Sequence, residues 1–492
     1  MVGTIGLALR SIAVARTQTN LAWDILLDLT PWRGPMHVRL TCSLRAAIRA
    51  GRLPRSAALP PSRSLAADLG MSRSTVTQAY GQLIAEGYLE ARTGSATRVH
   101  WAPGPDAPVP GQSASVPVPA RFDLTPGRPD LRAFPVHRWV AAIRSAAAST
   151  PFDQLGYPAP EGADRLRQVL AEYLGRVRGA AASSASTTIC TRGADAMMRA
   201  CRALRAEGIT RLAVEEPCWP LLREAAMAAG LEPVPVTVDD NGLVVDALCA
   251  RPDIRAVCVS ATHQFPTGVV MSPQRRAALL EWARGSGGVI IEDDYDAEFR
   301  YDRPAVATLH GMAPDRVFLL GSVSKTLAPA VGIGWVVTPA RFVQAVRAAS
   351  PFALVPPVLD QLALASFIES GAYDRHLRAA RLRYRARRRD LLRALASQLP
   401  GCPVEGAAAG LHLLVRLTAD TPASLITRAA ARRGLLVADL DRFRMKPDPQ
   451  RPALVLGYGN LPDAAAAQAV SILAETIAAA ATLTRTAGII CA

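Results

Sequence analysis

Apolar positions divide this chain of 492 residues into regions with different periodicities. From residue 37 to about residue 85 they recur every three or four positions in three short runs, which predicts three helices. Residues 101–120 show no apolar periodicity. From residue 121 to about residue 345, short runs rich in Val and Ile alternate with helical patterns. This alternation is typical of an α/β fold with a mostly parallel sheet that helices cover on both faces.

The three N-terminal helices have recognisable starts in the sequence. The first is expected near His37–Ala50. The second has Ser62 as a candidate N-cap, and the third begins after Ser72. A short helix, a tight turn and a second helix together predict a helix-turn-helix. Residues 87–92 and 97–99 follow as two strand patterns, which predict a β wing.

Positive charge is concentrated in this N-terminal region. Residues 30–100 contain ten arginines and three acidic residues, a net charge of +7 out of +15 for the whole chain. The outer face of the third predicted helix carries polar residue types that reach phosphates and base edges in the major groove. A basic helical bundle without a ligand would explain the charge but not the wing. The region is therefore predicted to bind double-stranded DNA.

Three strings in this region resemble the signature of the GntR-type winged helix, namely residues 59–66 (LPPSRSLA), 69–76 (LGMSRSTV) and 86–89 (EGYL). The resemblance implies that residues of the second and third helices contact DNA, together with the tip of the wing. Including the outer face of the third helix, the candidate DNA-binding residues are Arg63, Ser72, Arg73, Ser74, Thr75, Thr77, Gln78 and Gly94.

Two segments lack the patterns of a folded domain. Residues 1–29 are expected to be a disordered extension, and residues 101–120, with six prolines, a semi-rigid linker between domains at 30–100 and 121–482. No signal sequence and no membrane span are expected. The eight cysteines form no CxxC pair, which fits a cytoplasmic protein. The seven histidines are dispersed along the sequence, so no metal site is expected.

A lysine in the second region is unusual because lysine is so rare here. The chain has 56 basic residues, but Lys325 and Lys446 are its only lysines. Lys325 lies in the turn of residues 321–326 that follows the strand pattern Val317–Leu320, at the point where an α/β protein places its chemistry. A lysine amine can form a Schiff base, whereas an arginine guanidinium cannot. The alternative is an ordinary surface lysine.

Polar loops follow several of the other predicted strands. Residues 292–296 (EDDYD) follow one strand, residues 263–268 (HQFPTG) follow another, and residues 192–195 (RGAD) open a helix after a third. Because the carboxyl ends of parallel strands meet at one edge of the sheet, these loops are expected to lie near Lys325. An amine, a buried carboxylate, a phenol and a helix N-terminus are the groups that pyridoxal 5′-phosphate (PLP) requires.

The order and spacing of four strings resemble fold-type I aminotransferases: residues 126–135, 263–268, 291–301 and 321–329. With the GntR-type module in front, residues 33–460 resemble the MocR-type regulators. The resemblance implies a fold-type I PLP-dependent transferase domain with a large mostly parallel-sheet part and a smaller C-terminal α+β part. It also implies a homodimer with PLP as its cofactor.

The resemblance implies roles for particular residues. Lys325 is the Schiff-base lysine, Asp293 the partner of the pyridine nitrogen and Tyr295 the partner of the ring oxygen O3′. Asp294 remains a rival of Asp293, because a register error of one residue would exchange them. The other candidate cofactor-binding residues are Ser322, Gly193 and Ala194 at the phosphate, Trp219 stacked on the ring, and Tyr157 reaching the phosphate from a partner subunit. For Trp219 and Tyr157, an ordinary core position is an equal alternative.

Two positions depart from the family pattern. The family has a phosphate-binding arginine seven residues after the lysine, where this chain has Gly332. Catalytic members bind the substrate carboxylate with an arginine where this chain has Val455. Losing one charge-assisted phosphate contact costs about 1.5–3 kcal/mol. Arg192, next to the expected phosphate-binding helix, is a candidate to compensate for that loss.

The interpretation is a PLP-dependent DNA-binding transcription regulator whose aminotransferase-like domain senses an amine, an amino acid or PLP itself. One alternative is an active aminotransferase tethered to DNA, which the residue at 455 disfavours. Another is a regulator with a degenerate cofactor site. A dimer would present two winged helices to two DNA half-sites. The arginine-rich helix expected after residue 350 is interpreted as a solvated face.

Overall fold

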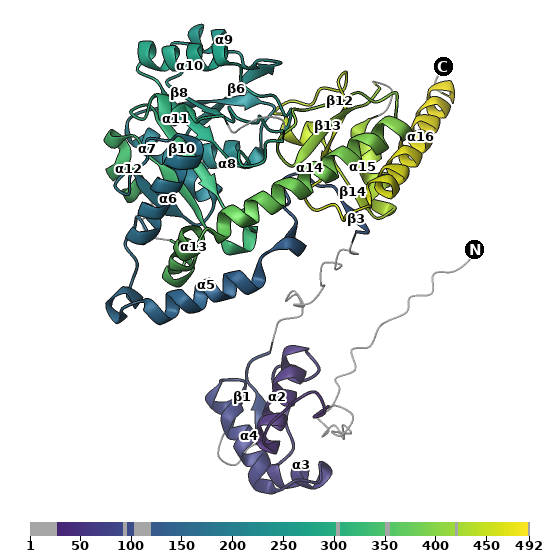
Figure 1. The fold of residues 1–492 in the computed structure, drawn as a ribbon. Coiled ribbons are helices and arrows are strands. Elements are labelled where there is room, and N and C mark those ends of the chain that lie inside the picture. Colours follow the sequence, from purple (N-terminus) through teal and green to yellow (C-terminus); the bar gives the residue numbers. More distant parts are fainter. Residues whose placement is uncertain are drawn as a thin grey trace, which may run out of the picture. The chain divides into compact units, whose positions relative to one another are not determined.

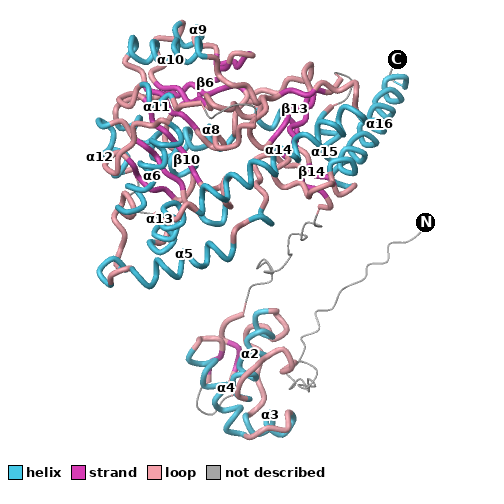
Figure 2. Tube along the Cα trace, in the orientation of Figure 1, coloured by secondary structure: helices cyan, strands magenta, loops and turns pink. Residues whose placement is uncertain are grey.

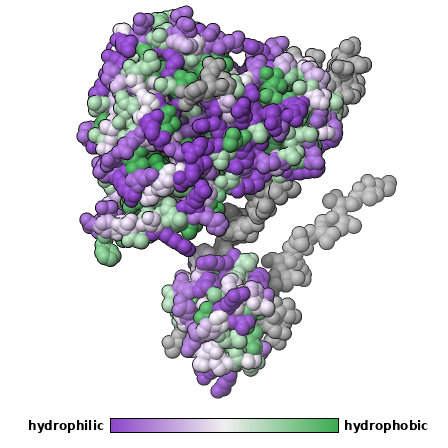
Figure 3. Space-filling view, in the orientation of Figure 1, coloured by the Kyte–Doolittle hydropathy of each residue, from purple (hydrophilic) through white to green (hydrophobic). Residues whose placement is uncertain are grey.

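The computed structural model describes residues 27–91, 96–102, 120–301, 306–349, 355–418 and 422–490 (Figure 1). Most of the predicted extension and linker, and Gly94 at the predicted wing tip, lie outside these ranges. The chain divides into two compact units, Met1–Pro117 and Val118–Ala492. Within the described ranges, no helix is long and apolar enough to cross a membrane. Hydrophilic residues cover much of the face seen in Figure 3.

Three helices and a small sheet form the N-terminal unit. The elements are α2 (Met36–Arg49), α3 (Ser62–Asp68), α4 (Arg73–Ala85), β1 (Leu89–Glu90) and β2 (Arg98–Val99). Leu40, Leu44, Leu65, Val76 and Leu83 are fully buried between the helices, as the apolar spacing predicts.

The sequence predicts an N-cap residue for two helices of this unit, and only one of the two predictions is confirmed. Ser72 caps α4, because its Oγ accepts the backbone N–H of Thr75 at 3.2 Å. The prediction for Ser62 is wrong, since Ser62 is the first residue of α3 and Pro61 occupies the cap position without a side-chain hydrogen bond. The fixed backbone of consecutive prolines leads into this helix in place of a polar cap.

The wing is shorter than its sequence pattern. Strands β1 and β2 pair antiparallel only at Leu89 with Val99 and Glu90 with Arg98. The other edge of β2 is paired as well, because the Val99 N–H donates to the carbonyl of Ala57 at 2.9 Å. Pairing on both sides holds this short strand in place.

The C-terminal unit is built on one eight-stranded sheet (Figure 2). Strands β10, β9, β8, β5 and β6 run parallel to one another, β11 runs antiparallel to both of its neighbours, and β7 pairs with β6 as a hairpin. In spatial order the strands are β4 (Thr187–Cys190), β11 (Gly334–Val337), β10 (Val317–Ser322), β9 (Val289–Asp293), β8 (Ala256–Val259), β5 (Arg211–Glu216), β6 (Glu232–Asp239) and β7 (Gly242–Leu243).

Helices pack on both faces of this sheet, because successive side chains of a strand point to opposite sides. Val289 and Ile291 pack with α7 (Gly193–Ala206) and α8 (Pro220–Ala228), while Ile290 packs with α10 (Pro273–Ser286). The remaining helices of this part are α5 (Val136–Ser149), α6 (Asp164–Arg178), α9 (Asp246–Cys249), α11 (Leu309–Met312), α12 (Val343–Ala348) and α13 (Val358–Glu369), with 3-10 turns η1 (Leu131–Ala133), η2 (Phe152–Leu155), η3 (Pro329–Val331) and η4 (Ala340–Phe342).

A smaller sheet forms the rest of the unit, as the sequence predicts. Its order is β12-β13-β16-β15, with every pair antiparallel. A separate parallel pair, β14 with β3, joins the start of the unit to this part. The elements are β3 (Phe122–Asp123), α14 (Ala372–Gln398), β12 (Val404–Glu405), β13 (His412–Arg416), α15 (Ala423–Arg432), β14 (Leu435–Leu436), β15 (Ala438–Asp439), η5 (Leu440–Phe443), β16 (Ala453–Gly457) and α16 (Ala466–Ile490).

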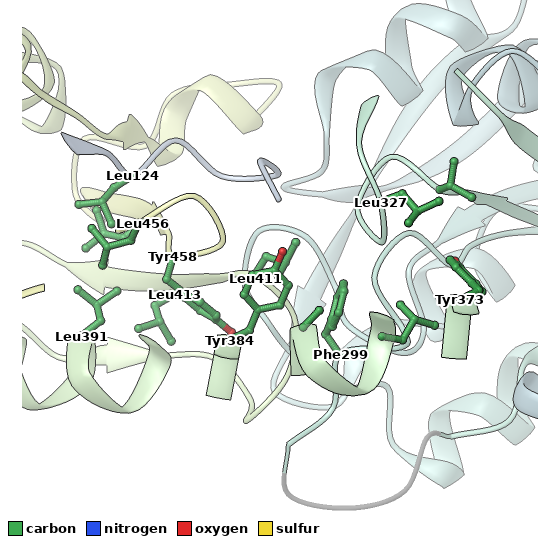
Figure 4. Close-up of a cluster of buried hydrophobic side chains, with 14 of the residues drawn as sticks. Leu124, Phe299, Leu327, Tyr373, Tyr384, Leu391, Leu411, Leu413, Leu456 and Tyr458 are labelled. Atoms are coloured by element: carbon green, nitrogen blue, oxygen red, sulfur yellow. The ribbon is translucent and has the colours of Figure 1, made fainter. Parts of the chain in front are cut away.

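Helix α14 connects the two sheets of this unit through one continuous core (Figures 1 and 4). Its Tyr384 lies edge-on to Phe299 at 5.0 Å, and Leu391 lies beside Leu413 of the smaller sheet. The prediction that its arginines form only a solvated face is wrong for Arg387, which is buried. Arg387 pairs with Asp130 at 2.7 Å, because that buried carboxylate needs a cation.

Candidate cofactor site and nucleic-acid interface

A cavity of about 230 Å³ lies around the turn that follows β10. It contains every predicted cofactor-binding residue except Tyr157. The lining residues are Gly127, Arg192, Gly193, Ala194, Trp219, Leu221, Leu222, Phe265, Asp293, Tyr295, Gly321, Ser322, Ser324, Lys325 and Pro329. They come from segments far apart in the sequence, so the strand ends converge as expected.

Lys325 is the only lysine that lines this cavity. Strand β10 ends at Ser322, and the buried side chain of Val323 anchors the turn that presents the lysine. The Lys325 Nζ donates to the carbonyl oxygen of Gly127 at 2.6 Å and lies 5.8 Å from the centre of the Trp219 ring. Burial lowers the pKa of Lys325, while Asp293 partly opposes that shift. A lowered pKa increases the fraction of nucleophilic neutral amine.

The two neighbouring aspartates have different surroundings. The two Asp294 oxygens each accept a hydrogen bond of 2.8 Å from the buried guanidinium of Arg178. Asp293 instead lines the cavity. Burial raises the pKa of Asp293 to about 7, with Asp294 adding to the rise and Lys325 opposing it. Asp293 is thus the carboxyl group that faces the cavity, and Asp294 is held in an ion pair with Arg178.

Tyr295 belongs to a buried polar group on the same loop. Its hydroxyl lies 3.1 Å from His263 Nδ1, and the same nitrogen lies 2.9 Å from an Asp296 oxygen. His412 completes a cluster in which one ligand atom each from His263, Asp296 and His412 lie within 4.8 Å of one another. Although the histidines are dispersed along the sequence, β13 brings His412 next to His263 in the fold.

The start of α7 and the turn after β10 form a polar end of the cavity. Gly193 and Ala194 are the first two residues of α7, and Ser322 and Ser324 face the same space. The first N–H groups of a helix have no intrahelical partner and favour an anion. Gly332 adopts a left-handed backbone with φ +66° and does not line the cavity. This end therefore has the donors that a phosphate needs without the usual arginine at 332.

An aromatic cluster forms the apolar side. Trp219 stacks on Phe443 at 5.8 Å and meets Phe265 edge-on at 5.0 Å. Val455 is fully buried in the same cluster. The position of the usual carboxylate-binding arginine is thus filled by packed apolar atoms. The sequence interpretation did not include Phe265 as a site residue, although it lies in the quoted loop 263–268.

These groups fit PLP on the evidence of their shape and chemistry. A Cβ on Gly127 would lie only 3.0 Å from Lys325 Nζ, so the absence of a side chain at 127 leaves room around the amine. The amine, the Asp293 carboxyl group, the Tyr295 hydroxyl and the α7 N-terminus surround one space. The chemistry of this donor set is that of a PLP site.

Tyr157 does not join this cavity within the chain. Tyr157 is fully exposed, and neighbouring Phe152 is 92% exposed. The alternative that Tyr157 is an ordinary core aromatic residue is therefore wrong. Its predicted contact from a partner subunit remains a prediction.

The candidate DNA-binding residues lie on α3 and α4. Arg63, Arg73, Ser74, Thr77 and Gln78 are exposed, whereas Thr75 is half-buried. Internal hydrogen bonds hold four of the side chains: Ser72 Oγ lies 2.8 Å from Thr75 Oγ1, Arg73 Nε donates to Ser62 Oγ at 3.4 Å, and Thr77 Oγ1 donates to the Arg73 carbonyl at 2.9 Å.

Helix α4 is held firmly behind this polar face. The buried Tyr80 hydroxyl donates to the Pro60 carbonyl at 2.9 Å. At the other end, Arg45 of α2 pairs with Glu86 at 2.6 Å. These contacts fix the α4 face relative to α2 and to the chain entering α3, which is a requirement for reading a DNA groove.

Comparisons with known proteins found a matching family for each of the two units. A family model for aminotransferase class I and II matches residues 122–451, and a model for bacterial regulatory proteins of the gntR family matches residues 37–99. The chain is 34% identical to the HTH-type pyridoxine biosynthesis transcriptional regulator PdxR of Corynebacterium glutamicum, over 89% of this chain and 95% of that protein. It is 33% identical to the probable rhizopine catabolism regulatory protein MocR of Rhizobium meliloti, over 87% and 90% of the two chains.

A solved structure with a similar fold is an archaeal alanine:glyoxylate aminotransferase. Its TM-score is 0.68 at 23% identity, and the match covers 74% of this chain and 91% of that chain. At this identity the likeness bears on fold alone. Together with the two family matches, it confirms the fold classes predicted for both units.

Proposed function

Because the chain belongs to the MocR-type transcription regulators, we propose that its aminotransferase-like unit binds PLP at Lys325 to sense PLP itself. The observation that carries this proposal is the cavity, which joins Lys325, Asp293 and Tyr295 to an apolar cluster around Val455. The cofactor-binding groups are present. The arginine that usually binds an amino-acid carboxylate is absent, because Val455 occupies its position.

Each residue has a proposed part in binding. When bound, PLP supplies an electrophilic aldehyde and an electron-accepting ring. Lys325 presents its amine to the aldehyde, Asp293 faces the pyridine nitrogen, and Tyr295 donates its hydroxyl hydrogen to O3′. Ser322 and the N-terminal N–H groups of α7 bind the phosphate. Trp219 covers one face of the ring.

The charges in the cavity favour PLP over an amino acid as the effector. Among the residues that line it, Lys325 and Arg192 are the only basic ones. A bound amino acid would present a carboxylate in addition to the phosphate of PLP. With Lys325 directed to the aldehyde, a single guanidinium is left for two anions. The relative PdxR is named for pyridoxine biosynthesis, which agrees with this effector.

We also propose a homodimer that reads two DNA half-sites. Exposed Phe152, Leu155 and Tyr157 lie together in sequence at η2. An exposed apolar segment of this kind favours contact with another chain. A second copy at this surface would pair two winged helices, each with its α4 face available to DNA. DNA binding and seven free cysteines among the described residues favour the cytoplasm.

The test joins cofactor binding to DNA binding. We expect purified protein with PLP to absorb visible light, and borohydride treatment followed by mass spectrometry to locate the adduct on Lys325. Lys325→Ala should lose the adduct, whereas Lys446→Ala, which changes an exposed lysine, should keep it. PLP should change operator affinity in the wild type but not in Lys325→Ala. An adduct on Lys446 would contradict the proposed site.

A second measurement addresses the tethered-aminotransferase alternative. A panel of amino acids is supplied to PLP-loaded protein, and formation of oxo acids is followed. We expect no turnover above that of the Lys325→Ala control. Rapid oxo-acid formation with any one amino acid would favour an enzyme in place of a sensor.

A further inference from the structure

Arg192 lies directly across the sheet from the position that lacks the family's phosphate arginine. Strands β11 and β4 pair antiparallel, with Gly334 opposite Cys190 and Trp335 opposite Ile189. If the same register is continued for two residues beyond the last pair, residue 332 lies opposite residue 192. The backbones stay close beyond the strands, because a Cβ on Gly334 would lie 2.7 Å from the Arg192 carbonyl carbon.

The backbone at 332 also disfavours a long side chain. Gly332 has φ +66°, a conformation that residues with a Cβ rarely adopt. Arg192 has an extended backbone with φ −167° and ψ 174°, which any residue adopts. An arginine is therefore accommodated at 192 without backbone strain, opposite the glycine at 332 when the register of the two strands is continued.

Arg192 is out of place for helix stability alone. It occupies the N-cap position of α7, where Ser, Thr, Asp and Asn are preferred. A cation there faces the positive end of the helix dipole, which is unfavourable. Within the described ranges, the side chain of Arg192 makes no hydrogen bond or ion pair that would offset this cost. Residues that break a local rule in this way are found mainly at functional sites.

We propose that Arg192 binds the phosphate of PLP and replaces the arginine that other members carry at the position of Gly332. This inference rests on the proposed cofactor site. Arg192 lines the same cavity as Ser322 and the first residues of α7. An anion at this point would pair with both the guanidinium and the helix N-terminus, and a guanidinium can bind two phosphate oxygens at once.

The test compares two ligands that differ only in the phosphate group. Dissociation constants of PLP and of pyridoxal are measured by absorbance for the wild type, Arg192→Gln and the control Arg202→Gln. Arg202 lies on an exposed part of the same helix and donates to the Ala349 carbonyl at 2.7 Å. Arg192→Gln should weaken PLP binding about ten- to a hundredfold and leave pyridoxal binding unchanged within about twofold. Arg202→Gln should change neither.

The outcomes separate this inference from the proposed function. Wild-type protein that forms no adduct on Lys325 would overturn the cofactor site itself. A normal wild type with an unchanged Arg192→Gln would overturn only the role of Arg192. A structural role would be indicated if Arg192→Gln weakened both ligands equally and lowered the melting temperature of the cofactor-free protein. We expect that temperature to stay the same or rise, because the substitution removes an unpaired cation from a helix N-terminus.

Discussion

At two positions near the cavity this chain lacks the arginine expected from the family pattern, and the surroundings of the two positions differ. At the polar end Gly332 replaces an arginine, and Arg192 lies across the strand pair from it. At the apolar end Val455 replaces an arginine, and the space is filled by Phe265 and Phe443. One end keeps a cation near an expected anion, while the other has become hydrophobic core. The expected phosphate-binding groups and the expected carboxylate-binding position thus differ in this chain, because only the former keep a basic residue.

The largest expected effect comes from restoring the charge at the apolar end. Val455→Arg places an unpaired guanidinium in a fully buried cluster, so we expect the free energy of unfolding to fall by about 5 kcal/mol. Leu382→Arg, at a side chain that is 69% exposed, should change it by less than about 0.5 kcal/mol. Denaturant unfolding measures both. A stable Val455→Arg protein would mean that this end can still accommodate the arginine that binds a carboxylate in catalytic members.

The adjacent aspartates Asp293, which lines the cavity, and Asp294, which does not, should respond differently to the same change. Asp294→Asn breaks the buried pair with Arg178, and we expect a loss of about 3–5 kcal/mol in the free energy of unfolding. Asp293→Asn removes a carboxyl group that has no such partner, so stability at pH 8 should be unchanged or higher while PLP binding weakens. Unfolding curves and absorbance titrations of both variants provide the comparison. Equal destabilisation by the two changes would contradict the separation of their roles.

The pH dependence of stability should report on Asp293 before cofactor binds. Its pKa is raised to about 7 in the folded chain, against about 3.9 when unfolded. Between these values the folded state holds a proton that the unfolded state has lost, so this group makes stability fall as pH rises. The slope is at most about 1.4 kcal/mol per pH unit and levels off above pH 7. Cofactor-free Asp293→Asn should therefore gain stability relative to the wild type from pH 4 to pH 7, and parallel curves would contradict this.

The smallest expected effect concerns the hydroxyl at the polar end. Ser322→Ala removes one neutral hydrogen bond to a phosphate, so PLP affinity should fall about three- to tenfold. Pyridoxal affinity should not change. The loss should be smaller than that of Arg192→Gln, because a neutral donor contributes less than a charged one. A larger loss for Ser322→Ala would reverse the proposed order of the two residues.

The parts of the site that sequence predicted are those fixed by local pattern. The turn holding Lys325 follows one buried strand, and α7 begins where a Gly follows another, so both were readable from neighbouring residues. The choice between Asp293 and Asp294 was not, because it depends on Arg178, over a hundred positions away in sequence. The burial of Arg387 and the meeting of His263 with His412 also depend on long-range packing. Charge counts along the chain carry no information on such contacts.

Helix α14 is one continuous element that connects the two sheets of the C-terminal unit. Its 27 residues span roughly 40 Å, and its buried residues belong to a core that includes residues of both the large and the small sheet. The small sheet carries Val455, and the turn that follows strand β10 of the large sheet carries Lys325. The helix is continuous from Ala372 to Gln398, so any change in the relative position of the two sheets has to be accommodated along this single element.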